Sequence, residues 1–207
     1  MLGHDTPCHV PAPRVSGDRV VLGNGRELWL RSIRPEDAKP IDGAFGLLRP
    51  EEVRLRYLHM IKALSPDYLH RLTHPVRGRD CVLVAAEPYP PGEALIGAVA
   101  RLSIDPPTAG ESDRQAEFAI LVSHFVAGYG LGRLLMKRLI DRARRRRLTR
   151  IYGDVLESNR AMLVLARRLG FRIDHETPGD GIARVVLELP AKRTPAPANR
   201  PRRSRAS

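Results

Sequence analysis

Hydrophobic positions along this chain follow two different patterns, one in the first third of the sequence and one after it. Residues 35–74 contain three short segments, RPEDA, RPEEV and SPDYL, in which a proline is followed by acidic residues, as is typical of helix starts. From residue 81 onward the apolar residues gather in short runs separated by turn residues, which indicates strands. The pattern predicts several short helices followed by a sheet.

The second part of the chain combines strands with two amphipathic helices. The predicted strands span residues 81–87, 94–104, 116–122, 150–156, 171–176 and 183–189, and an earlier strand pair is joined by a hairpin turn at Gly23, Asn24 and Gly25. Apolar residues at helical spacing mark one helix at Leu131, Leu134, Leu135, Leu139 and Ala143, and another at Met162, Leu165, Ala166 and Leu169. A strand meander followed by two strand–helix units predicts a mixed α/β sheet.

The two ends of the chain differ in composition from its centre. Residues 190–207 hold six of the basic residues and no acidic residue, so half of the formal net charge of +12 lies there. Such a segment cannot bury a hydrophobic core. We therefore expect one folded domain at residues 19–189, between a disordered tail at 1–18 and a basic disordered tail at 190–207.

Several classes of protein are disfavoured by composition. The chain has no apolar run long enough to span a membrane and no apolar segment typical of a signal peptide near its start. Two cysteines, Cys8 and Cys81, do not suggest a disulfide framework, so the cytoplasm is the expected compartment. His4, Asp5 and His9 lie near Cys8 without a second ligand cluster at a known spacing, so we expect no metal site.

The stretch FVAGYGLGRLLMKRL, Phe125 to Leu139, places three glycines between a strand and a helix. A helix start presents free backbone N–H groups, and glycine leaves room for an anion to reach them. Gly128, Gly130 and Gly132 are therefore consistent with a phosphate or pyrophosphate site. A tight turn without any ligand explains the same glycines equally well.

The order of glycine turn, helix, strand, Asn159, second helix and the tripeptide LGF resembles the GNAT superfamily of acyl-CoA N-acyltransferases. Its pyrophosphate signature, Q/R-x-x-G-x-G/A, corresponds to AGYGLG, Ala127 to Gly132. The stretches LRPEEVRLRYLHMIKALSPDYLHRLTHP and AEFAILV are similar to the bacterial protein-lysine acetyltransferase branch. The resemblance covers residues 26–189. It implies a GNAT-like fold: a mostly antiparallel central meander, one splayed parallel strand pair, and four or more helices on both faces.

The resemblance also implies acetyl-CoA as co-substrate and a set of residues that hold it. The pyrophosphate would lie on the backbone of Ala127, Gly128, Tyr129, Gly130, Leu131, Gly132 and Arg133, and the pantetheine amides on Ile120, Leu121 and Val122, with a further contact from Asn159. Asn159 is also explained as a helix N-cap, and Tyr129 by core packing. Two departures matter: Ala127 replaces the usual Gln or Arg, and Ala166 replaces a tyrosine that many members use as a proton donor.

Glu117 opens the strand before the glycine turn, ten residues before Ala127. In the resembling branch a glutamate at this spacing is the catalytic base. A lysine amine with a pKa of about 10.4 is almost fully protonated at neutral pH, so a base that removes its proton aids attack on a thioester. The alternative is an ordinary strand glutamate that pairs with a nearby arginine such as Arg101.

The expected activity is transfer of an acetyl group from acetyl-CoA to a primary amine, and the resemblance implies a lysine exposed on a protein. A small amine such as a polyamine or aminoglycoside is the alternative acceptor, for which an acidic pocket would draw on Glu36, Asp37, Glu51, Glu52 and Asp67. First-turn helix charges explain these acids as well. A different alternative is an inactive adaptor that contacts nucleic acid only through the basic tail.

The run from Arg144 to Arg147 is expected to offset the dipole of its helix.

Overall fold

The computed structural model describes residues 17–106 and 114–189, apart from the side chains of residues 177–179. The predicted tails lie outside the described residues, except that Asp18 already begins the first strand. Cys8 and the residues around it, and part of the polar loop before residue 116, lie outside them too.

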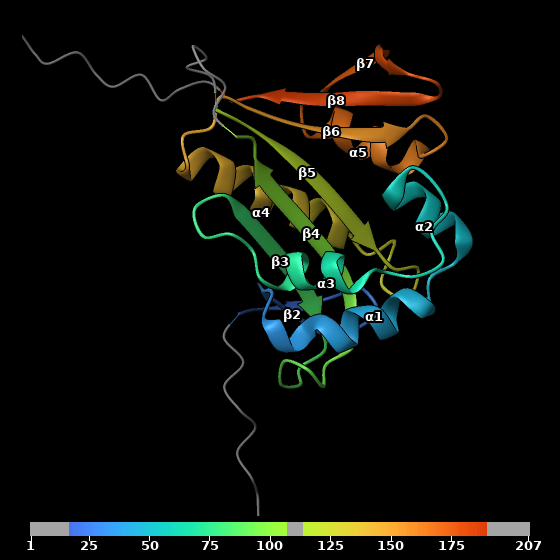
Figure 1. The fold of residues 1–207 in the computed structure, drawn as a ribbon, viewed down its shortest axis with the longest axis vertical. Coiled ribbons are helices and arrows are strands. Elements are labelled where there is room, and N and C mark those ends of the chain that lie inside the picture. Colours follow the sequence, from blue (N-terminus) through green and yellow to red (C-terminus); the bar gives the residue numbers. More distant parts are fainter. Residues whose placement is uncertain (1–16, 107–113, 190–207) are drawn as a thin grey trace, which may run out of the picture.

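The core of the molecule is one eight-stranded mixed sheet (Figure 1). Its strands are β1 (Asp18–Val21), β2 (Glu27–Ser32), β3 (Asp80–Ala86), β4 (Ile96–Ile104), β5 (Gln115–Val122), β6 (Arg150–Leu156), β7 (Arg172–Gly179) and β8 (Ile182–Glu188). The spatial order is β1-β2-β3-β4-β5-β6-β8-β7, and every neighbouring pair is antiparallel except β5 and β6. The predicted mixed α/β sheet and its antiparallel meander are confirmed.

Helices cover both faces of this sheet (Figure 1). One face carries the short 3₁₀ helix η1 (Pro35–Asp37), α1 (Ala38–Gly46), α2 (Pro50–Tyr57) and α3 (Pro66–Thr73); the other carries α4 (Leu131–Arg145) and α5 (Arg160–Arg168). The first group begins where the sequence predicts: Pro50 and Pro66 occupy first helical positions, and the Ser65 hydroxyl accepts a hydrogen bond from the Tyr68 N–H at 3.2 Å.

The continuous apolar run at β3 follows from this three-layer arrangement. Successive strand residues face opposite sides of a sheet, and here both sides are covered. Val82 and Val84 pack under α1 and α3, whereas Leu83 and Ala85 belong to the core beneath α4. The sheet is thus sandwiched between two hydrophobic cores.

The parallel strands β5 and β6 pair over only three register positions, from Gln115–Arg150 to Glu117–Tyr152. Both strands continue beyond this point without pairing to one another, so they splay as the family resemblance implies. Gly153 lies at the divergence: a Cβ there would be 2.9 Å from the ring of Phe118. Glycine therefore lets the Phe118 ring fill the apex of the splay.

Candidate active site

Glu117 occupies the last position at which β5 pairs with β6, where the splay begins. Its side chain is exposed and lines a pocket, here called the splay pocket, which lies between the diverging strands and the end of α2. The pocket is lined by Arg56, Tyr57, Glu117, Ala119, Asp154 and Asn159, among others. The sequence-predicted base therefore faces an opening.

Polar groups of β6 and β8 surround Glu117. Tyr152, its register partner, donates its hydroxyl hydrogen bond to Asp105 at 3.0 Å. Arg184 binds Asp154 through two hydrogen bonds of 2.8 and 2.9 Å, and its guanidinium lies 5.2 Å from the centre of the Tyr152 ring. Burial, followed by the hydrogen bond to Asp105 and the negative charges of Asp105 and Glu117, raises the pKa of Tyr152 to about 12. The phenol is therefore protonated at neutral pH.

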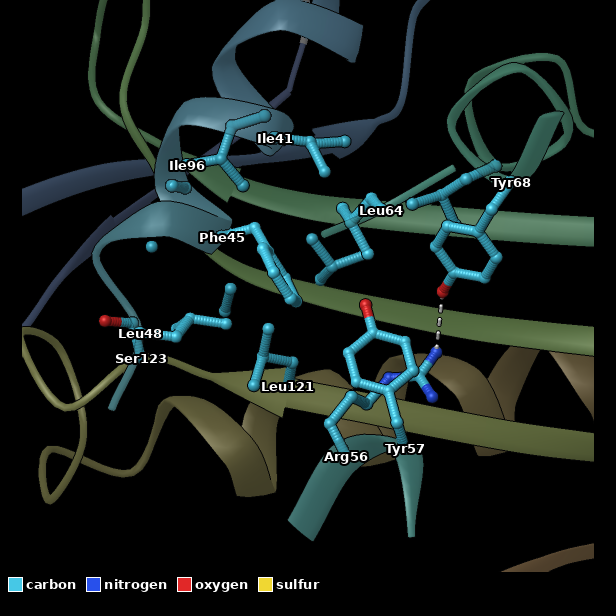
Figure 2. A pocket seen from close by; sticks show the side chains of 15 residues that line it. Ile41, Phe45, Leu48, Arg56, Tyr57, Leu64, Tyr68, Ile96, Leu121 and Ser123 are labelled. Carbon is cyan, nitrogen blue, oxygen red and sulfur yellow. Dashed lines mark hydrogen bonds between the residues drawn. The ribbon is translucent and has the colours of Figure 1, made fainter. Parts of the chain in front are cut away.

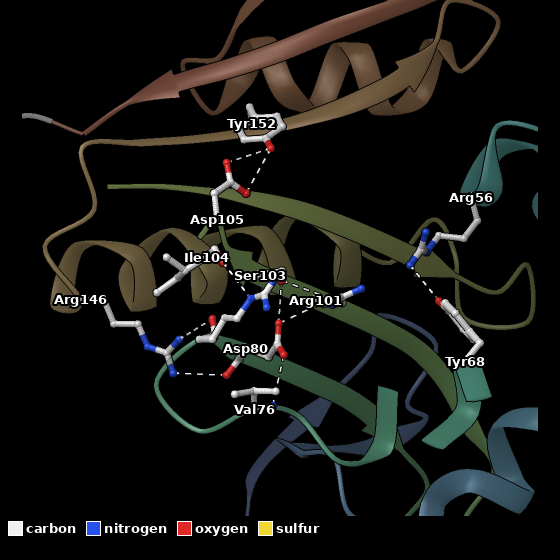
Figure 3. A network of polar contacts seen from close by, with 11 residues as sticks. Arg56, Tyr68, Val76, Asp80, Arg101, Ser103, Ile104, Asp105, Arg146 and Tyr152 are labelled. Atoms are coloured by element: carbon white, nitrogen blue, oxygen red, sulfur yellow. Dashed lines mark hydrogen bonds and ion pairs between the residues drawn. The ribbon is translucent and has the colours of Figure 1, made fainter. Parts of the chain in front are cut away.

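Arg101 does not pair with Glu117, so that alternative for the glutamate is wrong. Its guanidinium lies 3.5 Å from Asp80 and donates a 3.2 Å hydrogen bond to the Ser103 hydroxyl, which in turn donates to Asp80 at 2.6 Å (Figure 3). Burial alone would raise the pKa of Asp80, but hydrogen bonds from Ser103 and Val76 and the charge of Arg101 outweigh it and lower the pKa. Within the described part of the chain Glu117 forms no ion pair.

The glycine turn has the backbone conformation that only glycine adopts readily. Gly128 and Gly130 have φ angles of 87° and 82°, and Gly130 is the N-cap residue of α4. A Cβ on either residue would meet no atom within 4 Å, so the space above both is open. Among the described residues no side chain caps the first amides of α4. An anion therefore has free access to these N–H groups.

The other predicted residues of this turn differ in exposure. Ala127, Tyr129 and Arg133 are exposed, whereas Leu131 is buried and offers a ligand only its backbone. Tyr129 is 46% exposed, so the core-packing alternative for it is wrong. Gly132 lies in the first turn of α4, where a Cβ would meet Leu165 and Val122 at ordinary contact distances.

The strand segment Ile120–Val122 has one paired and one open edge. It pairs with Ala98–Ala100 of β4, while β6 pairs with no residue of β5 beyond Glu117. The side chains of Ile120 and Val122 pack against the core beneath α4, and Leu121 points to the other face. Backbone groups on the open edge are thus available to an extended ligand such as a pantetheine arm.

Asn159 and Ala166 lie on the same helix with different surroundings. The Asn159 side chain accepts the Met162 N–H at 3.1 Å, which confirms its role as N-cap of α5, and it also lines the splay pocket. Ala166 is fully buried in the core. The position at which many family members carry a tyrosine therefore has no proton donor here.

Sequence reasoning missed a contact between α2 and the loop that follows β5. The backbone N–H and Nδ1 of His124 contact the two carboxylate oxygens of Glu52 at 2.6 and 2.8 Å. Glu52 also accepts the Arg49 N–H at 2.8 Å. Burial would raise the pKa of Glu52, but these hydrogen bonds together lower it. The contact fixes the chain between the strand that carries Glu117 and the glycine turn.

The splay pocket is lined by none of the early-helix acids Glu36, Asp37, Glu51, Glu52 and Asp67. Asp37 is buried and binds Arg31 through two hydrogen bonds of 2.6 and 2.7 Å, and Glu52 is held by His124. In the described ranges no group of three His, Cys, Asp or Glu side chains is placed to hold a metal ion. Likewise, no helix there combines the length and apolarity needed to cross a bilayer.

Comparison with known proteins adds to this geometry. Residues 54–171 match the sequence profile described as the Acetyltransferase (GNAT) family. Acetyltransferase PA5475 of Pseudomonas aeruginosa is 31% identical to the chain over 168 residues, which make up 80% of this chain and 87% of that protein.

Many solved structures share the fold. The GNAT domain of the S. lividans protein PAT superposes with a TM-score of 0.72 at 24% identity, covering 83% of this chain and 96% of that one. A GNAT superfamily phosphinothricin acetyltransferase from Sinorhizobium meliloti, solved in complex with acetyl-CoA, gives a TM-score of 0.61 at 17% identity, covering 78% and 88%. The second structure contains the co-substrate that the sequence implies for this chain.

Proposed function

Since this chain belongs to the Acetyltransferase (GNAT) family, we propose that it transfers the acetyl group of acetyl-CoA to lysine side chains of proteins. Membership makes the chain an acyl-CoA-dependent N-acyltransferase. The proposal adds the acceptor, the base and the residues that hold the donor. One observation carries it: Glu117 stands at the apex of the β5–β6 splay and faces an open pocket.

The residues around the splay fit acetyl-CoA in two places. The amides at the start of α4, beside the open space over Gly128 and Gly130, would hold the pyrophosphate, and the exposed side chain of Arg133 adds positive charge. The open edge of Ile120–Val122 would hold the pantetheine arm, with Asn159 beside it. Ala127 contributes no side-chain contact, so binding at the turn depends on the backbone. Acetyl-CoA supplies an activated thioester.

In the proposed reaction Glu117 accepts a proton from the lysine ammonium, directly or through one water. The lysine nitrogen then forms a bond to the thioester carbonyl carbon, the carbon–sulfur bond breaks, and the nitrogen loses its second proton to solvent. Because a thiol has a pKa near 8.5, the leaving group departs as a thiolate without a strong acid. The buried Ala166 is compatible with this, since solvent can protonate the thiolate.

A lysine acceptor is favoured over a polyamine by the state of the acidic residues. A multiply charged amine needs several free carboxylates around the base. Of the early-helix acids, Asp37 and Glu52 are already bound by Arg31 and His124, and none lines the splay pocket. The sequence similarity of residues 48–75 and 116–122 to the protein-lysine branch supports the same acceptor.

The test is acceptor identification with labelled acetyl-CoA. The full chain is incubated with folded bacterial proteins, or with spermidine and an aminoglycoside, and modified sites are mapped by mass spectrometry. Parallel reactions with Glu117→Gln correct for spontaneous acetylation. We expect Glu117-dependent label on protein lysines. Label confined to the small amines would contradict the lysine acceptor.

A further inference from the structure

Arg56, next to the last residue of α2, lines two pockets at once. The first is the splay pocket with Glu117. The second, here called the aromatic pocket, lies between α1, α2, α3 and the strands β4 and β5; its lining includes Phe45, Tyr57, Leu64, Tyr68 and Leu121 (Figure 2). Arg56 and Tyr57 belong to both linings, so they form the junction between the base and an apolar cavity.

Two tyrosines hold the Arg56 guanidinium in place. It donates a hydrogen bond to the Tyr68 hydroxyl at 3.3 Å, and its carbon lies 4.9 Å from the centre of the Tyr57 ring (Figures 2 and 3). The two tyrosine rings meet edge to face at 5.9 Å, and Phe45 meets Tyr57 in the same way at 6.1 Å. An aromatic scaffold of this kind reduces the conformational freedom of the arginine before any ligand binds.

Three arginines of the sheet, each buried or half-buried, have carboxylate partners. Arg31 pairs with Asp37, Arg101 with Asp80, and Arg184 with Asp154. For Arg56, by contrast, no carboxylate oxygen in residues 17–106 and 114–189 lies within 4.0 Å. A half-buried guanidinium among apolar side chains is ordinarily paired, because its charge is poorly solvated there.

The geometry points to Arg56 as a subsite that binds a carboxylate of the acceptor. The enzyme would therefore prefer a lysine flanked by Asp or Glu. This inference rests on the proposed function, in which the lysine amine approaches Glu117 through the splay pocket. A fixed cation beside that route disfavours a bare ammonium, and a carboxylate near the amine offsets this effect. Among the described residues the guanidinium donates one hydrogen bond, to Tyr68, so a two-point contact with a carboxylate is open.

The first measurement uses paired acceptors that differ only in a carboxylate. Short lysine peptides carry Asp or Asn at one of the two positions on either side of the lysine. Nα-acetyl-lysine and its C-terminal amide form a second pair, which separates an α-carboxylate from a side-chain carboxylate. We expect kcat/KM to be about tenfold higher for the acidic member of at least one pair, the size of a charge-assisted hydrogen bond.

Variants assign the preference to Arg56. Arg56→Gln should bring the ratio of kcat/KM for the acidic acceptor to kcat/KM for the amide acceptor close to one. Arg56→Lys should leave a smaller ratio than wild type, because an ammonium lacks the planar fork of a guanidinium. Arg54→Gln is the matched control: it removes the same charge from an exposed position of the same helix and should keep the wild-type ratio. Equal rates within every pair for wild type, or a preference that survives Arg56→Gln, would overturn the subsite.

Binding of product peptides separates this inference from the proposed function. Titration calorimetry compares acetyl-lysine peptides that carry Asp or Asn, so no turnover is needed. Suppose that no lysine probe is acetylated, but the acetyl-lysine peptide with Asp binds about tenfold tighter than the peptide with Asn, and only when Arg56 is present. The lysine acceptor is then wrong and the subsite stands. If lysine is acetylated but neither turnover nor product binding distinguishes Asp from Asn, the subsite is wrong and the function stands.

Discussion

Glu117 on β5 stands opposite Tyr152 on β6 at the last register position where these two parallel strands pair. Beyond it the strands diverge, with the ring of Phe118 against Gly153 at the apex. This relationship sets the carboxylate at the edge of a gap in the sheet. The open edge of β5 leads from there to the glycine turn, so one strand connects the proposed base with the proposed donor site.

The glycine turn gives a prediction that separates strain from ligand binding. Gly130 and Gly25 both have positive φ angles, 82° and 81°, with open space around a Cβ. Alanine at either position should lower the free energy of unfolding by roughly 1–2 kcal/mol. Only Gly130→Ala should also weaken acetyl-CoA binding, measured by titration calorimetry, because its methyl group enters the proposed pyrophosphate site.

Gly132→Ala is the second control for this turn. Gly132 is helical, and a Cβ there meets Leu165 at 3.7 Å, so its substitution should leave the fold stable. Acetyl-CoA affinity that is equal in Gly130→Ala and Gly25→Ala would count against a pyrophosphate at α4.

Restoring the family's tyrosine should not restore a proton donor. Ala166 is fully buried, so Ala166→Tyr must displace core side chains at a cost of about 1–3 kcal/mol or more. We expect a lower melting temperature and no increase in kcat. Val164→Tyr, on the exposed side of the same helix, is the control and should melt like wild type. A stable Ala166→Tyr variant with faster turnover would contradict the account of the leaving group.

The Glu52–His124 contact predicts a pH dependence of stability. The folded state lowers the pKa of Glu52, so its stabilising effect is present above the unfolded value of about 4.3 and is lost as the pH falls through the folded pKa. The free energy of unfolding of wild type should exceed that of Glu52→Gln by about 1–2 kcal/mol at pH 7. This difference should shrink in acid. Urea denaturation of both proteins at pH 7 and in acid measures this difference in the free energy of unfolding.

Glu51→Gln provides the comparison for the same helix turn. Glu51 is exposed, so its substitution should have little effect at either pH. A constant difference between wild type and Glu52→Gln from pH 7 into acid would show that the carboxylate charge is not what stabilises the contact.

Local patterns made much of this fold predictable. The strands 81–87, 94–104, 116–122 and 150–156 agree with β3 to β6 to within two residues, because apolar runs and turn residues are features of neighbouring positions. The splay itself came from the family resemblance, since no periodicity distinguishes a strand that pairs over three positions from one that pairs throughout.

Side-chain partners were less predictable, because they join distant parts of the chain. No sequence pattern marks His124 as a partner of Glu52, 72 residues away, yet the two side chains are in contact. The position of Asp37 after Pro35 predicts a first-turn helix charge, but the structure shows a buried partner of Arg31. Arg101, the example of a partner in the alternative for Glu117, binds Asp80 instead. Composition and spacing carry no record of such pairings, which depend on how the layers pack.

The most direct test of the central claim is the turnover number of Glu117→Gln with acetyl-CoA and a lysine peptide at saturating concentrations. Glu188→Gln, an exposed strand glutamate on β8, is the control. If Glu117 accepts the proton from the amine, kcat should fall by roughly 10²- to 10⁴-fold while acetyl-CoA binds as it does to wild type. Turnover equal to that of the Glu188→Gln control would contradict the claim.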